Sequence, residues 1–293
     1  MTIPNLTIIG ERINPGFKSS KALFDNEDLP GIQALAKRQA DAGASYLNVN
    51  IGTKALDDPQ FMKAVIEAIQ AVVSIPLSFD FPHAEVQEIC LKCFDQEKAG
   101  GRKPIINSVA ETRLDMLELL KIRPFKLVVM ASERLENGVP RPNKKSEQVI
   151  GVAHRMAKLL TGSPHNMPLD DILIDVSISL LAADTEGLTR MAIEAIREIG
   201  GAPTLKGIHI MGGLSNISGQ LPAKAVDGSN LKLQLEEAFL TLTVPYGFDT
   251  ILATPWKDYQ LLPDDNPVLS AFKEIIALNG FDAMRKLRKL YSS

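Results

Sequence analysis

Residues 77–96, LSFDFPHAEVQEICLKCFDQ, contain the structural unit from which we predict the fold. The run Leu77–Asp80 has the length and apolar character of a buried strand, and it ends on a carboxylate. The next segment, Ala84–Gln96, places apolar residues at the three- and four-residue spacing of an amphipathic helix. A short buried strand followed by a helix is the repeating unit of parallel α/β folds.

The same pair of patterns occurs eight times along the chain. The predicted strands are Leu6–Ile9, Tyr46–Asn50, Leu77–Asp80, Pro104–Ser108, Lys126–Met130, Ile172–Asp175, Gly207–Met211 and Thr250–Ala253. The predicted helices are Gly31–Ala42, Gln60–Val73, Ala84–Gln96, Arg113–Leu120, Ser146–Leu160, Glu186–Ile199, Leu231–Thr243 and Pro267–Leu278. Eight strand–helix units in 293 residues predict an α/β protein with a (β/α)8 TIM barrel, for which about 250 residues are typical. The tail Phe281–Ser293 predicts one extra C-terminal helix.

A doubly wound parallel sheet is the alternative architecture. It would normally carry a G-x-G-x-x-G turn after one strand, and the glycines of GGLSN at 212–216 have a different spacing. No linker rich in Pro, Gly or Ser divides the sequence, so we expect a single domain over residues 1–293. The most loop-like stretches, Ser132–Lys145 and Ser218–Asn230, each follow a predicted strand, on the side where barrel enzymes bind substrate.

Composition argues against nucleic-acid and membrane partners. The formal net charge is −3, and Lys and Arg are scattered along the sequence. No apolar stretch approaches the roughly 20 residues that span a bilayer. The N-terminal sequence MTIPNLTIIGERIN has no basic segment before its short apolar run, so we expect no signal peptide and a cytoplasmic protein.

The cysteines and histidines form no recognisable catalytic or metal-binding motif. Cys90 and Cys93 form a C-x-x-C, but they lie within a helical pattern and no second pair completes four ligands, so we expect two ordinary thiols. The four histidines have no partners at metal-ligand spacing, and we expect no metal bound directly by the chain. The sequence also lacks G-x-S-x-G, Walker A and H-E-x-x-H motifs, which argues against acyl transfer, NTP hydrolysis and zinc hydrolysis.

Several predicted strands are followed by, or end on, a carboxylate or an amide. These residues are Glu11 and Asn14 in GERIN, Asn48 and Asn50 in LNVNIG, Asp80, Asn107, Asp175 and Asn216. Each one alone is consistent with a turn former or a helix cap. In a closed barrel all of them would converge on one rim, which predicts a pocket rich in carboxylates and amides without a histidine base. Such a pocket suits a planar ligand with N–H donors along one edge, as in a pterin.

Six segments together resemble a known family. They are IIGERIN (8–14), LNVNIG (47–52), the strand ending at Asp80, INS (106–108) with Glu111 shortly after it, the strand ending at Asp175, and GLSNIS (213–218). In this order they resemble the methyltetrahydrofolate:corrinoid methyltransferases, which belong to the pterin-binding barrel family that includes the dihydropteroate synthases. The resemblance extends from residue 8 to about residue 255, nearly the whole chain.

The resemblance implies a methyltransferase of one-carbon metabolism. Its substrate would be tetrahydrofolate or 5-methyltetrahydrofolate, and the methyl group would move between N5 and the cobalt of cobalamin, a corrinoid carried by a partner protein. Asp80, Asn107 and Asp175 would hold the pterin ring, and Asn216 would be the catalytic residue that hydrogen-bonds N5. The direction of transfer and the identity of the corrinoid protein stay open. The family also implies a homodimer.

Two features depart from the family pattern. Residue 48 is Asn where acetogen-type members carry Asp, and the segment after Asn216, SGQLPAKAVDGSN, is longer than in those members, so that Gln220 is only a candidate ligand. We expect five residues at the rim of the pocket around the four named above. They are Glu11, Asn14, Asn48, Asn50 and Gln220.

Two other functions remain open. A dihydropteroate synthase should show a DIGGES-like second strand and an R-x-H near the last strand, whereas this chain has LNVNIG and ILATPWKD there. A non-catalytic folate-binding protein would have no need of Asn216 at N5. Methyl transfer to free cob(I)alamin would distinguish such a binding protein from a methyltransferase.

Overall fold

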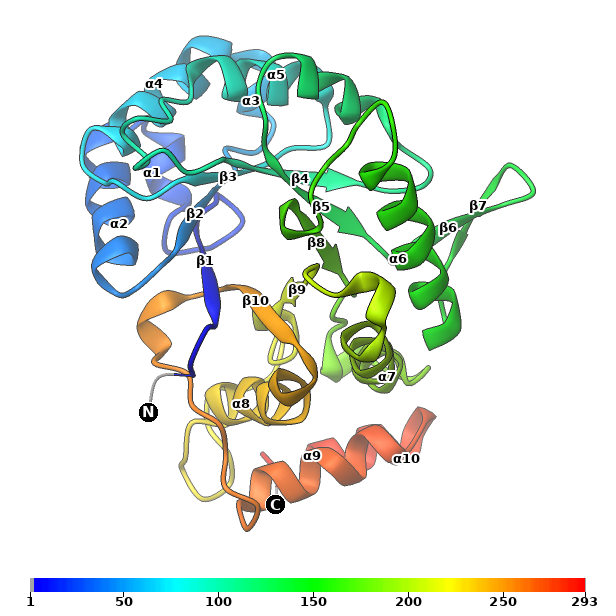
Figure 1. Ribbon diagram of the computed structural model, residues 1–293. Helices are drawn as coiled ribbons and strands as arrows, with labels where there is room; N and C mark the ends of the chain where they lie inside the picture. The colour runs from blue at the N-terminus through cyan, green and yellow to red at the C-terminus, as the bar shows by residue number, and fades with distance from the viewer. Residues whose placement is uncertain (1–2, 293) are drawn as a thin grey trace.

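Eight parallel strands close into a barrel in the computed structural model, which describes residues 3–292 (Figure 1). The strands are β1 (Thr7–Ile13), β2 (Tyr46–Val49), β3 (Leu77–Asp80), β4 (Ile105–Val109), β5 (Lys126–Met130), β8 (Ile172–Asp175), β9 (His209–Gly213) and β10 (Phe248–Ala253). Each of these eight strands pairs with the next barrel strand along the chain, and β10 pairs with β1 to complete the circle. The predicted (β/α)8 TIM barrel is confirmed.

Helices surround the barrel (Figure 1). The α-helices are α1 (Lys21–Asp25), α2 (Leu29–Asp41), α3 (Lys54–Asp57), α4 (Pro59–Gln70), α5 (Ala84–Cys93), α6 (Ser146–Thr161), α7 (Leu188–Gly201), α8 (Leu231–Thr243), α9 (Pro267–Ala277) and α10 (Gly280–Arg288). The extra C-terminal helix is therefore present as α10, and Ser293 at the end of the predicted tail lies outside the described residues. No helix within residues 3–292 is long and apolar enough to cross a membrane.

One predicted α-helix is wrong in type. The segment predicted as a helix over Arg113–Leu120 is instead a 3₁₀ helix, Asp115–Lys121. The first residue of the predicted segment, Arg113, forms a β-bridge with Ala110 beside the end of β4. Few residues then remain between this bridge and the start of β5. A 3₁₀ helix rises about 2.0 Å per residue, against about 1.5 Å for an α-helix, so it spans the barrel wall with fewer residues.

The strand β1 is longer than predicted. The prediction ended it at Ile9 and treated GERIN as the loop that follows, whereas β1 continues to Ile13 with a bulge between Gly10 and Ile13 relative to β2. The irregular part of β1 keeps its hydrogen bonds, since the backbone amide of Arg12 donates to Gln39 Oε1 at 2.8 Å. Glu11 is therefore a buried residue of the barrel wall and does not belong to a loop.

The predicted loop Ser132–Lys145 contains a β-hairpin, which projects from the barrel (Figure 1). Its strands are β6 (Glu133–Glu136) and β7 (Val139–Pro142), joined by Asn137 and Gly138, both with positive φ as a two-residue hairpin turn requires. Glu111 anchors the hairpin, because its carboxylate accepts the Leu135 amide at 3.2 Å and pairs with Arg155 at 2.6 and 2.9 Å. The other predicted loop, Ser218–Asn230, has no helix or strand among its residues in the structure.

Two layers of side chains fill the barrel, and they determine where a ligand fits. A small apolar cluster packs one inward residue from each of several strands: Ile9, Tyr46, Ile105, Val128, Leu173 and Met211, with Leu252 against it. Because side chains alternate along a strand, the residues two positions further on also point inward. On four strands these are Asn107, Met130, Asp175 and Gly213. The apolar layer closes the barrel below, and the next layer forms the floor of a cavity at the C-terminal end.

Candidate functional site

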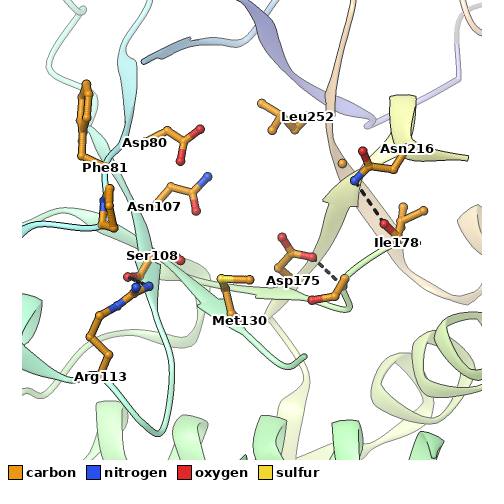
Figure 2. A pocket seen from close by; sticks show the side chains of 13 residues that line it. Asp80, Phe81, Asn107, Ser108, Arg113, Met130, Asp175, Ile178, Asn216 and Leu252 are labelled. Carbon is orange, nitrogen blue, oxygen red and sulfur yellow. Dashed lines mark hydrogen bonds between the residues drawn. The ribbon is translucent and has the colours of Figure 1, made fainter. Parts of the chain in front are cut away.

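A cavity of about 440 Å³ opens at the C-terminal ends of the strands (Figure 2). It is lined by Asp80, Phe81, Pro82, Asn107, Ser108, Arg113, Met130, Asp175, Ser177, Ile178, Gly213, Asn216 and Leu252. The structure thus brings together the four residues that the family resemblance assigns to the pterin and to N5, namely Asp80, Asn107, Asp175 and Asn216. Phe81, Met130, Ile178 and Leu252 supply apolar walls between them.

Asp80 is the last residue of β3 and lies opposite Asn107 of β4 in the strand register. Its Oδ2 accepts hydrogen bonds from Asn48 Nδ2 at 3.2 Å and from Asn50 Nδ2 at 3.4 Å. Burial raises the pKa of Asp80, and these two hydrogen bonds oppose that rise. An amide at position 48 therefore donates to Asp80 where a second carboxylate would repel it.

The polar cluster continues below Asp80 into the barrel. Asn48 and Ser78 are adjacent in register on β2 and β3, and both are about 1% exposed. Asn48 Oδ1 and Ser78 Oγ are buried without a hydrogen-bond partner among residues 3–292. Unsatisfied buried acceptors are unfavourable, so this part of the barrel favours a ligand or water that donates hydrogen bonds.

Asp175 is the second carboxylate of the cavity and ends strand β8. The backbone amide of Ser177 donates to Asp175 Oδ1 at 2.6 Å. Burial raises the pKa of Asp175 to about 6, the hydrogen bond from Ser177 opposes the rise, and the charge of Asp80 adds to it. The carboxylate therefore gains a proton closer to neutral pH than an ordinary Asp.

Gln87 on α5 fixes the ends of β3 and β4, although no sequence motif marks it as part of the site. This fully buried side chain donates from Nε2 to three carbonyls, those of Phe79, Phe81 and Asn107, at 2.9, 3.0 and 3.0 Å. It thereby holds Asp80 and Asn107 in place from behind. The only sequence signal was an amide at an apolar position of the predicted helix.

Asn216 ends a 3₁₀ turn, Leu214–Asn216, directly after β9. Its Nδ2 donates to the carbonyl of Ile178 at 3.2 Å, as Figure 2 shows, so its Oδ1 is left as an acceptor. Glycine at position 213 of GLSN suits a close approach, because a Cβ there would lie 3.1 Å from Asn216 Nδ2 and would press on that side chain. This turn therefore places an amide at the edge of the cavity.

Three of the five expected rim residues do not line the cavity and do not contact its carboxylates. Glu11 is buried in the barrel wall, where it accepts hydrogen bonds from Ser215 and Thr254 at 2.8 and 2.7 Å. Asn14 forms a local turn, with Oδ1 accepting the amide of Gly16 at 2.7 Å. Gln220 is exposed in the segment that follows Asn216. The remaining two, Asn48 and Asn50, act on Asp80 from outside the lining.

Arg113 lines the cavity and was assigned only to a helix in the sequence analysis. Its Nη2 donates to the carbonyl of Ser108 at 3.1 Å, which holds the guanidinium beside the end of β4 (Figure 2). Within residues 3–292, no hydrogen-bond partner is present for its buried Nε. A cation shortly after a strand is too common a pattern to mark such a residue from sequence.

The cysteines lie in a helix, as predicted. Cys90 is buried in α5 and Cys93 is its last residue, both thiols are free, and burial raises the pKa of each. Within residues 3–292, no group of three or more His, Cys, Asp or Glu side chains is arranged to hold a metal ion. The polar residues of the cavity are two carboxylates, two amides, two serines and Arg113 between apolar walls, a set that can hold a flat heterocycle by its polar edge.

Comparison with known families matches residues 11–252 to the family described as pterin binding enzyme. The chain belongs to the pterin-binding enzyme family. This pterin-binding enzyme is 29% identical over 257 residues to the methylcorrinoid:tetrahydrofolate methyltransferase of Eubacterium limosum, a match that covers 85% of each chain.

Solved structures similar to this pterin-binding enzyme include dihydropteroate synthases. That of Thermus thermophilus has a TM-score of 0.58 and 17% identity, with 87% of this chain and 90% of that chain covered. That of Xanthomonas albilineans, solved with 7,8-dihydropteroate, has a TM-score of 0.55 and 15% identity, with 95% and 96% covered. At these identities the likeness concerns the fold.

Proposed function

We propose that this protein transfers a methyl group between N5 of tetrahydrofolate and the cobalt of a corrinoid carried by a partner protein. The convergence of Asp80, Asn107, Asp175 and Asn216 on one cavity carries the proposal. Family membership supports a pterin ligand, and the printed name of the Eubacterium limosum relative supports the corrinoid as the second reactant.

In this proposal the two carboxylates and Asn107 bind the polar edge of the pterin. A carboxylate accepts two parallel hydrogen bonds from an amino group and the adjacent ring N–H, and an amide serves an edge with mixed donors and acceptors. Asp80 and Asn107 come from neighbouring strands, while Asp175 lies on β8. Arg113 adds positive charge at the edge of the cavity.

Asn216 acts at N5. Because its Nδ2 is bound to the Ile178 carbonyl, its Oδ1 is the atom available to accept a hydrogen bond from a protonated N5. When the methyl group leaves N5 for Co(I), the electron pair of the N–C bond stays on N5, and a proton there makes the pterin a better leaving group. In the opposite direction the lone pair of N5 attacks the methyl carbon, and the electron pair of the Co–C bond returns to cobalt.

A dihydropteroate synthase remains the alternative with the same fold. That reaction releases pyrophosphate, for which cationic side chains are the usual ligands. Among the thirteen lining residues, all within residues 3–292, Arg113 is the one Lys or Arg. This scarcity of cations favours methyl transfer.

One set of assays tests these functions. The wild-type protein is mixed with 5-methyltetrahydrofolate and cob(I)alamin, and formation of methylcobalamin is followed by absorbance, with the reverse reaction measured in parallel. We expect transfer in both directions. Folate binding without transfer would establish a non-catalytic binding protein, and formation of dihydropteroate from its pterin pyrophosphate and p-aminobenzoate would establish a synthase.

The finer features implied by the family are part of the same proposal. We expect one pterin-binding domain over residues 1–293, a homodimer and a cytoplasmic location. Sedimentation velocity of the purified chain tests the dimer, and fractionation of the native cells tests the location. Capture of the corrinoid protein from those cells, followed by the transfer assay, tests the partner.

A further inference from the structure

Two serines on either side of Asn216 donate to buried carboxylates from distant parts of the chain. Ser215 Oγ donates to Glu11 on β1 at 2.8 Å, and Ser218 Oγ donates to Glu236 on α8. Asn216 lies between these two anchors in the sequence. The turn that presents it to the cavity is therefore fixed from behind at both ends.

The same two carboxylates also bind the segment that follows β10. Glu11 accepts the Thr254 hydroxyl at 2.7 Å. Glu236 accepts Lys257 Nζ at 2.6 and 2.7 Å and the Tyr259 hydroxyl at 3.0 Å. Segments 214–218 and 254–259 are thus joined twice, once through each carboxylate, and neither carboxylate lines the cavity.

Stability alone is a weak explanation for Glu236. Its side chain is 0% exposed, and Lys257 is 27% exposed. Burying an ion pair has a desolvation penalty, and well-packed apolar residues in its place are often neutral or stabilising. Hydrogen bonds with directional geometry, in contrast, restrict where Ser218 can lie. The arrangement thus favours a role in fixing geometry.

We propose that Glu236, with Glu11, is a positioning residue that holds the turn Leu214–Asn216 so that Asn216 Oδ1 faces the cavity. The inference rests on the proposed methyl transfer, because it assigns Glu236 an effect on the group at N5. Misplacement of a reacting group by about 1 Å can reduce a rate by roughly 10²-fold. Loss of the anchor should therefore slow transfer more than it weakens folate binding.

The main test removes both charges with the double variant Glu236→Leu/Lys257→Met. We expect single-turnover methyl transfer at saturating folate to fall by about 10- to 100-fold, with the Kd for tetrahydrofolate within about threefold of wild type. The matched control is Lys103→Met/Asp171→Leu, which removes a similarly buried ion pair before β4 and β8, at the other end of the barrel, where the side chains are 34% and 6% exposed. The control should transfer methyl at the wild-type rate.

The conservative variant Glu236→Gln separates geometry from charge, since its Oε1 can still accept the Ser218 hydroxyl. We expect it to recover the rate to within about fivefold of wild type. If the double variant does not fold, Ser218→Ala replaces it, and a rate loss of about three- to tenfold with unchanged Kd is expected.

Several results would overturn the inference. Wild-type rates in the folded double variant, or in Ser218→Ala where the double variant is unfolded, would refute the positioning role. A fall in folate affinity equal to the fall in rate would show that Glu236 only maintains the cavity. Absence of transfer by the wild-type protein itself would refute the proposed function, and with it the role of Glu236 in that reaction.

Discussion

Asp175 combines a position in the cavity with an unusual readiness to accept a proton. Its pKa is about 6 in the free protein because of burial, and the proposed ligand presents N–H donors that require the ionised form. Replacing Asp175 by Ala should weaken tetrahydrofolate binding by about 2–4 kcal/mol, as expected when a charge-assisted pair is lost. Calorimetry measures this, and unchanged affinity in a folded variant would show that Asp175 is a structural cap.

The same residue predicts a pH dependence. As the pH falls through about 6, Asp175 becomes protonated in the free protein, and the affinity for tetrahydrofolate should fall with it. Asp175→Asn should bind weakly and lose this step between pH 5 and 8. Calorimetric titrations of both proteins over this range provide the comparison; identical pH profiles would exclude Asp175 as the group that titrates.

Asn216 should affect the rate more than binding. Asn216→Ala removes the acceptor assigned to N5, and we expect kcat to fall by roughly 10²–10³-fold, as for an oxyanion-hole donor, with a smaller change in Kd. Single-turnover transfer between methyltetrahydrofolate and cob(I)alamin, with folate affinity measured in parallel, gives both quantities. Weak folate binding by Asn216→Ala with a normal transfer rate at saturating folate would refute the role of Asn216 at N5. The proposal that the cavity binds the pterin would stand.

At the scale of elements, Gln87 connects a helix to two strand ends. Gln87→Leu removes three hydrogen bonds donated to the carbonyls of Phe79, Phe81 and Asn107, of which the Asn107 carbonyl still accepts the Phe81 amide at 3.2 Å. We expect the free energy of unfolding to fall by about 2–4 kcal/mol and folate binding to weaken, because Asp80 and Asn107 lose their support. Urea unfolding and calorimetry test this, with Gln33→Leu as control, since Gln33 donates one hydrogen bond, to the Ala68 carbonyl, away from the cavity.

The strands and helices were largely predictable because their signals are local. Strands β3, β5 and β8 have the predicted bounds, since a short, mostly apolar run between two helical patterns is visible in the sequence itself. The extension of β1 was not predictable, because the partners of Glu11 lie 204 and 243 residues further along the chain. The 3₁₀ helix after β4 was not predictable either, because it depends on how few residues connect β4 to β5 in the folded chain. The spacing of apolar residues in the sequence does not show this.

The residues of the candidate site also fall into two groups, those that the sequence could indicate and those that it could not. The convergence of strand ends placed Asp80, Asn107, Asp175 and Asn216 among eight candidates. The resemblance to the pterin-binding barrels singled out these four. Arg113 was not identifiable, because a cation shortly after a strand is too common to mark a site. Gln87 and Glu236 were not identifiable either, because each is defined by contacts with side chains or carbonyls of other elements and not by a pattern. The expected role of Glu11 at the rim failed for this reason: its carboxylate serves Ser215 and Thr254 within the wall.

At the scale of the whole molecule, the two ends of the barrel differ in their chemistry. His209 begins β9 at the end opposite the cavity, where Nδ1 lies 2.7 Å from Asp249 and Nε2 lies 3.3 Å from Asp170. The hydrogen bond to Asp249 is the main cause of the raised pKa of His209. The interaction stabilises the folded state below the unfolded pKa of about 6.5, and this contribution is lost as the pH rises through the higher folded pKa.

The variant His209→Asn tests that pH dependence. Its free energy of unfolding should be lower than that of wild type at pH 6, and the difference should shrink as the pH rises above 7. Urea unfolding at several pH values measures this. Methyl transfer per folded molecule should not change, because the apolar layer separates His209 from the cavity. A constant difference at all pH values would mean that His209 contributes by packing alone.

The hairpin β6–β7 has a consequence for behaviour at high protein concentration. Glu136 and Val139 are the paired residues next to the turn. In this register the backbone nitrogens of residues 140 and 142 point away from β6. Both residues are prolines, which have no N–H to donate. On the opposite edge the Leu135 amide is already bound to Glu111. Three of the four outward-facing amide positions of the hairpin therefore offer no free donor, and the projecting arm is a poor template for a strand from another molecule. Replacing both prolines by Thr should expose such a template, and light scattering of concentrated solutions should then show fibrous self-association that the parent protein resists.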